Sequence, residues 1–376
     1  MTNAMLQRCY EYLKFLDETN AKILKGITYY GPRNLTRLAK AINLPITTVG
    51  FRLKKLIKAG LLCVTVNPNL LRLGLTKAFF IAEAKLGHHE ALKELITNID
   101  YWTYIIRCYG KMDGYCAYIA FPTNYKKELE KYFHEASKTQ IFSRYNFYWI
   151  TNSHFVPPDF SWYDFKKKEW QFNWRKWLDE ILNAPVDLPE VLKEENSRIM
   201  VDKKDLILIK ELEKNAMINF KKLAETLKIT PQSVGARYQN HIIQRKLVIE
   251  YIVDIYPFPA QFSDLYNFII DFKSEKALAK FVNASDGKPF IVSYAKIMGR
   301  NSLIVNIYIL KEEFPNLIKS LNQLYRAGLI NSLFYVTLDP TSYRRQTISY
   351  EFFNDGKWSY DAEAKMKKLK EISELH

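Results

Sequence analysis

The sequence predicts an α+β protein in which a winged helix-turn-helix, followed by a ferredoxin-like βαββαβ domain, occurs twice in one chain. Three observations lead to this prediction: a repeat about half the chain long, helical periodicity at the start of each copy, and alternating strand-like and helical runs in the rest. With 376 residues, the chain also exceeds the size at which a single hydrophobic core stops growing.

The repeat is clearest in two segments that align without a gap, Asn34 to Leu62 and Asn219 to Leu247. They share a Leu-Ala pair, a Val-Gly pair and an arginine, Arg52 in the first copy and Arg237 in the second. Downstream, the order of apolar and amphipathic runs also recurs. The chain is therefore interpreted as a tandem duplication.

The first part of each copy predicts three helices and a strand. Asn34 and Asn219 are suited to cap the second helix, and Thr230-Pro231 places a cap residue and a proline where a third helix would begin. The third helix has one apolar side and one basic or amide-rich side. Two helices joined by a tight turn, with such an outer face on the second, are typical of a helix-turn-helix, and the strand that follows predicts a wing.

This outer face predicts contact with the major groove of duplex DNA, where arginine suits guanine and side-chain amides suit adenine. The alternative is that these are simply exposed helix residues. The residues predicted to bind DNA are Arg33, Arg37, Thr47, Thr48, Phe51, Arg52, Lys54, Lys55, Lys58, Gln232, Ser233, Arg237, Gln239, Asn240 and Arg245.

The second part of each copy predicts βαββαβ, with helices covering one face of each sheet. The first and last strands are expected at Ala78 to Ala84 and Ile141 to Ile150, and again at Leu265 to Phe272 and Ile330 to Leu338. The predicted divisions are an N-terminal helix (1–18), a first winged helix-turn-helix (19–77), a first regulatory domain (78–150), an aromatic-rich extension (151–182), an acidic linker (183–200), a second winged helix-turn-helix (201–257), a second regulatory domain (258–338) and a C-terminal extension (339–376).

The charge balance favours a polyanionic partner. Lys and Arg number 55 against 40 Asp and Glu, a net charge of +15, and no acidic residue lies between Glu18 and Glu83. The second helix-turn-helix carries Glu211, Glu213 and Glu225, so its field is expected to be weaker. The first copy would then supply most of the electrostatic attraction.

Several classes of function are not expected. No apolar run is long enough to cross a bilayer and no signal peptide is evident, so a cytoplasmic location without a membrane partner is predicted. The four cysteines lack C-x-x-C spacing, the six histidines are scattered, and no phosphate-binding loop or nucleophile elbow occurs. We therefore expect no catalytic residues, no metal site and no cofactor, and the chain is not predicted to be an enzyme.

Tryptophans and other aromatic residues gather after the first unit, around Trp162, Trp170 and Trp177. They could form a stacking platform for unpaired bases or the wall of an apolar effector pocket. The favoured interpretation is packing over the sheet or between the two halves, because a similar stretch with Trp358 follows the second unit.

The segment Asp205 to Leu247 resembles the winged helix-turn-helix of the Lrp/AsnC, or feast/famine, family of transcription regulators. The resemblance rests on the Leu-Ala of the second helix, the Thr-Pro-x-Ser-Val opening of the third, and Arg237 three residues after that valine. The βαββαβ runs are similar to the regulatory domain of the family, whose Gly-x-x-Asp turn is kept at Gly110 and Asp113 but not after Gly299.

The resemblance implies a DNA-binding transcription regulator, a single-chain pseudo-dimer that places two recognition helices in the major groove. It also implies a small effector near Gly110, Asp113 and Gly299, and further partners in homo-oligomers. Two alternatives are an architectural DNA-binding protein of weak specificity and a module that contacts the transcription machinery. Some decarboxylases that act on siroheme resemble the same family in fold, but they would need arginines and histidines converging on a tetrapyrrole, and the two units share no such set.

Overall fold

The computed structural model describes residues 15–196, 198–255 and 257–375, so most of the predicted N-terminal helix over 1–18 lies outside the described residues. Each half of the chain contains one βαββαβ unit. The first consists of β2 (Leu75–Ala84), α5 (His89–Thr97), β3 (Trp102–Gly110), β4 (Gly114–Pro122), α6 (Lys126–Ser137) and β5 (Phe142–Ile150). The second consists of β10 (Ser263–Phe272), α11 (Glu275–Ser285), β11 (Ile291–Lys296), β12 (Ser302–Leu310), α12 (Phe314–Arg326) and β13 (Ile330–Leu338). The predicted α+β class and the duplicated arrangement are confirmed.

The two four-stranded units join edge to edge. The strand order is β5-β2-β4-β3-β13-β10-β12-β11-β6, with β6 covering His154–Phe155 and β14 (Arg344–Arg345) pairing with β3. Antiparallel β3 and β13 connect the units at Gly110 and Val336. At the other edge Ile150 bridges to Ile297, and the Thr151 N–H donates to the Lys296 carbonyl at 2.9 Å. The two halves of the sheet therefore face each other and meet along both edges.

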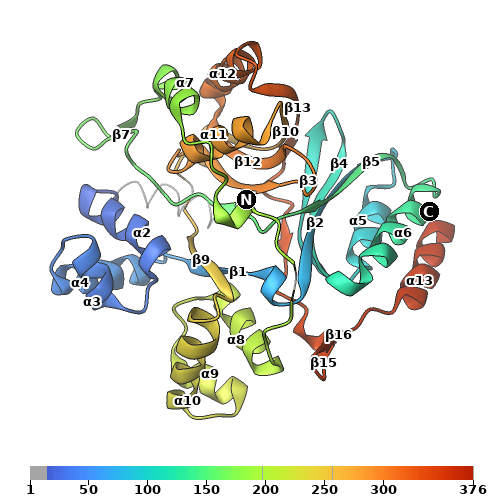
Figure 1. Cartoon of the computed structure of the whole chain (residues 1–376), viewed down its shortest axis with the longest axis horizontal. Helices are drawn as coiled ribbons and strands as arrows, with labels where there is room; N and C mark the ends of the chain where they lie inside the picture. Colours follow the sequence, from blue (N-terminus) through green and yellow to red (C-terminus); the bar gives the residue numbers. More distant parts are fainter. Residues whose placement is uncertain (1–14, 197, 256, 376) are drawn as a thin grey trace.

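Helices cover the outer faces of this sandwich (Figure 1). α5 and α6 lie on the first unit together with the C-terminal α13 (Ala362–Leu375), and α11 and α12 lie on the second together with α7 (Trp174–Asn183). On β2, Phe80 stacks on Phe133 of α6 with ring centroids 4.2 Å apart, whereas its neighbour Phe79 contacts Tyr118 on the inner face. Because side chains alternate along a strand, β2 is buried on both faces.

A three-helix unit precedes each βαββαβ unit. The elements are α2 (Glu18–Tyr30), α3 (Leu35–Ala41), α4 (Ile46–Lys58) and β1 (Val64–Pro68), and then α8 (Lys203–Lys214), α9 (Phe220–Leu227), α10 (Pro231–Arg237) and β9 (Val248–Val253). The expected caps are present, since the side chains of Asn34, Asn219 and Thr230 accept backbone N–H bonds at the starts of α3, α9 and α10. Unlike α4, α10 continues as a π-helical turn over Tyr238–Ile243.

The strand after each three-helix unit crosses to the other copy. β1 and β9 pair with each other in antiparallel register, with Val66 opposite Tyr251. β1 packs on α8 and β9 packs on α2, so each strand covers the first helix of the opposite unit. The two halves therefore hold each other at this strand pair, which lies between the three-helix units and the large sheet (Figure 1).

The aromatic extensions also cross over. Two short hairpins, β7–β8 (Tyr163–Asp164 and Glu169–Trp170) and β15–β16 (Phe353–Asn354 and Lys357–Trp358), each end at a tryptophan. The Trp170 indole N–H donates to the Pro257 carbonyl at 3.1 Å, and that of Trp358 donates to the Leu73 carbonyl at 2.7 Å. Each extension therefore packs against the other half of the chain.

The remaining helical turns are short 3-10 segments that connect larger elements, at Leu70–Arg72, Thr123–Tyr125, Glu190–Leu192, Ala260–Phe262, Lys311–Glu313 and Tyr350–Phe352. Within the described ranges, every helix is too short or too polar to cross a bilayer.

Candidate functional site

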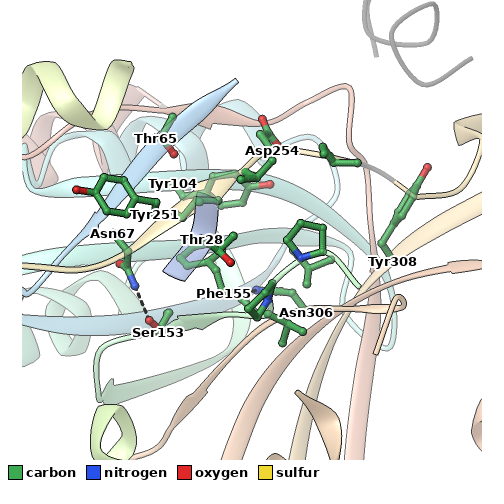
Figure 2. Close-up of a pocket in the computed structure, with 18 of the residues that line it drawn as sticks. Thr28, Thr65, Asn67, Tyr104, Ser153, Phe155, Tyr251, Asp254, Asn306 and Tyr308 are labelled. Atoms are coloured by element: carbon green, nitrogen blue, oxygen red, sulfur yellow. Dashed lines mark hydrogen bonds between the residues drawn. The ribbon is translucent and has the colours of Figure 1, made fainter. Parts of the chain in front are cut away.

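A cavity of about 330 Å³ lies at one end of the sandwich, where the inner faces of both βαββαβ units meet the β1–β9 pair (Figure 2). Its volume is at the lower end of the range for small-molecule sites, roughly 300–1,000 Å³. The strand pair contributes Thr65 and Tyr251, α2 contributes Thr28, and the second sheet contributes Asn306 and Tyr308. Both βαββαβ sheets, the β1–β9 pair and the first helices of the three-helix units thus line one space.

A row of side chains on the inner face of the first unit runs along the cavity wall. Phe79 lies opposite Tyr118, Tyr118 opposite Tyr104, and Tyr104 opposite Arg345 of β14. Lys77 lies two residues before Phe79 on β2, so it faces the same side. The Tyr118 hydroxyl accepts a bond from Asn306 at 3.0 Å, which connects this row to the opposite sheet.

Glu213 of α8 is the buried acid of the cavity. Its side chain lines the cavity and the residue is 8% exposed. Burial raises the pKa of Glu213 to about 7, although the Ile348 backbone N–H, which donates to its carboxylate at 3.0 Å, and the charges of Arg345 and Lys77 act to lower it. A carboxyl group with a pKa near neutrality can both donate and accept a proton, as general acid–base catalysis requires.

Two cationic side chains face the same space. Lys77 Nζ donates to Ser153 Oγ at 2.8 Å and lies 4.9 Å from the centre of the Tyr118 ring. Burial lowers the pKa of Lys77 to about 8. Arg345 is exposed at the cavity rim, and its guanidinium forms no hydrogen bond or ion pair with any residue that the structure describes.

A network of charged groups supports one side of the cavity. His154 Nδ1 lies 2.8 Å from Glu250 of β9, and its Nε2 lies 3.7 Å from Asp286. Burial alone would lower the pKa of His154, but the hydrogen bonds with Asp286 and Glu250 outweigh it and raise the pKa to about 9. Asn67 of β1 donates to Glu250 at 2.9 Å and to the Ser153 carbonyl at 2.7 Å. The network fixes the β1–β9 pair to the segment that carries Ser153.

The residues predicted to bind DNA are separated into two groups. Ten are exposed on α3, α4, α10 or the turn after it, and Thr48 is half-buried on α4. The ten are Arg37, Thr47, Phe51, Lys54, Lys55, Lys58, Gln232, Ser233, Gln239 and Asn240. None of these eleven residues lines the cavity.

The other four predicted residues, all arginines, are engaged inside the protein. Arg33 donates to the Ile218 carbonyl at 2.8 Å, with its guanidinium over the Phe220 ring, and so joins the two three-helix units. Arg245 donates to the Met200 carbonyl at 3.0 Å. Arg52 pairs with Asp17, and Arg237 pairs with Asp202 and Asp205. The shared arginine of the repeat therefore ties the third helix to the start of the first in both copies.

The predicted effector residues lie at the far end of the sheets from the cavity. The Gly110 backbone pairs with Val336, and Asp113 accepts a bond from Arg107 at 2.8 Å. The Gly299 N–H donates to the Glu194 carboxylate at 2.9 Å. The turns between central strands and the β1–β9 pair are at opposite ends of the strands, so the structure does not bring these residues together with the cavity.

One set of potential metal ligands occurs among the described residues. Ligand atoms of Asp202, Asp205 and His241 lie within 4.8 Å of one another. Arg237 Nη1 lies 2.8 Å from Asp202 and 3.3 Å from His241 Nδ1, and it also contacts Asp205. The guanidinium supplies the positive charge that this cluster requires, so the arrangement is suited to an ion-pair network.

The sequence interpretation did not identify the cavity residues. Lys77 and Glu213 come from different copies, and Arg345 comes from the C-terminal extension. The sequence does contain one signal for Glu213. With Leu206 and Ile209 it follows the helical spacing of the buried face of α8, where a carboxylate is rare unless it is paired.

Comparison with solved structures finds whole-chain similarity to the siroheme decarboxylase NirDL. The structure of NirDL alone is 11% identical, with a TM-score of 0.50, and the match covers 94% of this chain and 98% of NirDL. The structure of NirDL in co-complex with an iron-uroporphyrin III analogue is 13% identical, with a TM-score of 0.52. This match covers 96% of the present chain and 100% of the NirDL chain. LrpC of B. subtilis, at 18% identity and a TM-score of 0.28, covers 36% of this chain and 94% of its own.

No protein-family model matches the sequence, and no curated protein matches it either. At these identities, the likeness to NirDL shows a shared fold.

This likeness corrects two predictions. The expectation of a DNA-binding regulator, with its architectural and protein-contact alternatives, and the expectation that the chain is not an enzyme were both wrong, because the whole-chain match is to an enzyme. The physical reason is that the duplicated architecture encloses a cavity between its halves, and the linear sequence shows neither the cavity nor the groups that line it.

Proposed function

We propose that this chain is a decarboxylase whose active site is the cavity between the two sheets and the β1–β9 pair. The proposed substrate is a carboxylated tetrapyrrole, the kind of molecule for which NirDL is named. The observation that carries the proposal is Glu213, a buried carboxyl group with its pKa raised to about 7, in a cavity that also presents the unpartnered Arg345. A decarboxylase needs a proton donor and an anion-binding group in these roles.

The proposed reaction is non-oxidative. The bond between the substrate carbon and its carboxylate breaks, CO2 leaves, and the electron pair that remains on carbon takes a proton from neutral Glu213. The ionised Glu213 regains a proton from solvent, so the net change is replacement of a carboxylate by hydrogen. Nothing is oxidised or reduced outside the substrate.

Arg345 would hold a carboxylate that stays on the substrate. A guanidinium binds carboxylate strongly and stabilises its charge, which opposes the loss of that same group as CO2. The carboxylate that leaves would instead lie over Tyr104 and Tyr118, whose burial raises the pKa of each hydroxyl and keeps it uncharged. A substrate with several carboxylates fits this division of roles. The cavity would admit one edge of the macrocycle, with the rest at its mouth.

The three-helix units have a structural role in this proposal. As winged helix-turn-helix domains by element order, they contribute Thr28, Asn67, Glu213 and Tyr251 to the cavity instead of reading DNA. The chain then divides as the sequence suggests, into two such units, two βαββαβ domains, an acidic linker and two aromatic extensions.

The test uses the full-length chain with siroheme or iron-uroporphyrin III under anaerobic conditions, with CO2 release and product mass as readouts. Glu213→Gln should lower kcat by a factor of about 10²–10⁴, the usual contribution of a general acid. Glu225→Gln is the matched control, because Glu225 is exposed on α9 and does not line the cavity. Arg345→Gln should mainly raise KM. Binding without any decarboxylation by the folded protein would overturn the proposal, as would full activity of Glu213→Gln.

A further inference from the structure

The Lys77 amine is a group that the proposed reaction does not use. It faces the cavity and donates to a hydroxyl, Ser153 Oγ, at 2.8 Å. Among residues 15–196, 198–255 and 257–375, no carboxylate forms an ion pair with it. A lysine in a cavity wall without an anionic partner differs from an ordinary surface lysine, whose ammonium is fully hydrated.

The surroundings of Lys77 lower the pKa of its amine. Burial is the main effect and lowers its pKa, and Arg345 on β14 lowers it further. Glu250 on β9 and Glu213 on α8 act in the opposite direction, and the pKa is about 8. At pH 7.5 about a quarter of such amines are uncharged, against roughly 0.1% for an ordinary lysine. Desolvation of this kind is how nucleophilic lysines are activated.

Arg345 gives the cavity a second recognition element. The row from Lys77 and Phe79 through Tyr118 and Tyr104 to Arg345 lies on one face of adjoining strands. An amine at one end and a free guanidinium at the other suit a ligand with two different groups, a carbonyl for the amine and a carboxylate for the guanidinium.

We propose that Lys77 forms a Schiff base with a carbonyl compound that carries a carboxylate, an oxo acid. The uncharged Nζ adds to the carbonyl carbon and the C=O π bond breaks; both protons of the amine then move to the carbonyl oxygen, which leaves as water as the C=N bond forms. One amine and one carbonyl thus give one imine and one water, with no oxidant or reductant consumed. Ser153, within hydrogen-bond distance of Nζ, orients the amine.

The experiment treats the full-length protein with 6-oxohexanoate, an aldehyde whose carboxylate lies at the other end of a flexible chain, and with sodium cyanoborohydride, which reduces an imine to a stable secondary amine. Peptide mapping by mass spectrometry then gives the labelling rate at each lysine. At pH 7.5, Lys77 should react at least tenfold faster than Lys54, which is exposed on α4. Its rate should level off above pH 8, whereas the rate at Lys54 keeps rising. The label at this position should disappear in Lys77→Met.

The role of Arg345 is tested with an uncharged probe. Arg345→Gln should slow the labelling of Lys77 by 6-oxohexanoate several-fold more than its labelling by hexanal, because loss of the Arg345 charge also raises the pKa of Lys77 and slows both reactions. The proposal would be overturned if labelling followed surface exposure, with Lys77 reacting no faster than Lys54. It would also be overturned if Arg345→Gln slowed the labelling of Lys77 equally with both probes. Because no decarboxylation is measured, the result is independent of the proposed function. Glu213→Gln should keep a labelled Lys77 even where it abolishes CO2 release.

Discussion

Arg237 and Asp205 form an ion pair between the third and first helices of the second three-helix unit, and the Asp205 side chain is fully buried. The first repeat has the same connection, since Arg52 pairs with Asp17 and its Nη1 lies 3.4 Å from Asn20, the counterpart of Asp205. The first copy has one acidic partner, Asp17, which is 50% exposed, much like its counterpart Asp202 at 52%; the neutral Asn20 stands where the second copy has the buried Asp205. The arginine that recurs in both copies thus has the same structural role, but only in the second copy does it pair with a fully buried carboxylate.

Arg237→Gln should lower the free energy of unfolding by about 3 kcal/mol, because it removes the guanidinium that pairs with the buried Asp205. Arg52→Gln should cost less than about 1 kcal/mol, since its partner is largely solvated. Urea denaturation measures both, with the exposed Arg37→Gln as control. Equal losses at Arg52 and Arg237 would contradict the role of burial.

Glu213→Gln should change stability in a pH-dependent way. The pKa of Glu213 is raised from 4.5 to about 7 in the folded protein, so ionisation opposes folding as pH rises through this window. Compared with the Glu213→Gln variant, the wild-type protein should lose up to about 3 kcal/mol of its free energy of unfolding as the pH rises from 4.5 to 7. Below pH 4.5 its free energy of unfolding should show no such loss. Thermal unfolding at pH 5 and pH 8 tests this. The control variant Glu225→Gln should show no such trend. If the Tm difference between the wild-type protein and Glu213→Gln is the same at pH 5 and pH 8, ionisation of Glu213 does not affect stability.

His154→Gln should show the opposite pH trend. The pKa of His154 is raised from 6.5 to about 9, so the stabilisation from Glu250 and Asp286 is complete below pH 6.5 and is lost as pH rises through 9. We expect the variant to be less stable by about 2–3 kcal/mol at pH 6 and the deficit to shrink by pH 9.5. Urea titrations at both pH values measure it, with the exposed His134→Gln as control. A deficit that is equal at both pH values would show that charge is not its cause.

Trp170→Phe and Trp358→Phe should each reduce stability, because each removes an indole N–H that donates to a backbone carbonyl of the other half. A buried acceptor left without its donor costs about 1–3 kcal/mol. Trp102→Phe controls for the smaller ring, since its indole N–H bonds to no residue in the described part of the chain. Chemical denaturation of the three variants gives the comparison. Losses no larger than that of Trp102→Phe would show that the two crossing bonds contribute little.

Much of the fold could be predicted from the sequence because its signals are local. The caps Asn34 and Asn219 and the Thr230-Pro231 start depend on bonds within one helical turn, and the structure has them where they were expected. The strand Ile330–Leu338 coincides with its prediction, because β-branched and aromatic residues dominate its second half. The π-helical turn after Arg237 was not predicted, since no local pattern distinguishes it.

The site was predicted less well for the same reason. Arg52 and Arg237 were correctly identified as equivalent, but their exposure to a ligand was inferred from helical position alone. Their partners lie 35 residues earlier in the chain, and helical periodicity over a single helix does not report such contacts.

The sequence by itself determined the duplication, the order of helices and strands, and the positive charge of the chain. Tertiary structure alone decided that β1 pairs with β9 of the other copy, and that Lys77, Glu213 and Arg345 line one cavity. Propensity, capping and periodicity act within a few residues, and a sequence displays them directly. Strand exchange between repeats and the pKa of a buried group depend on which distant segments exclude water from each other, and that is fixed only when the two halves pack together.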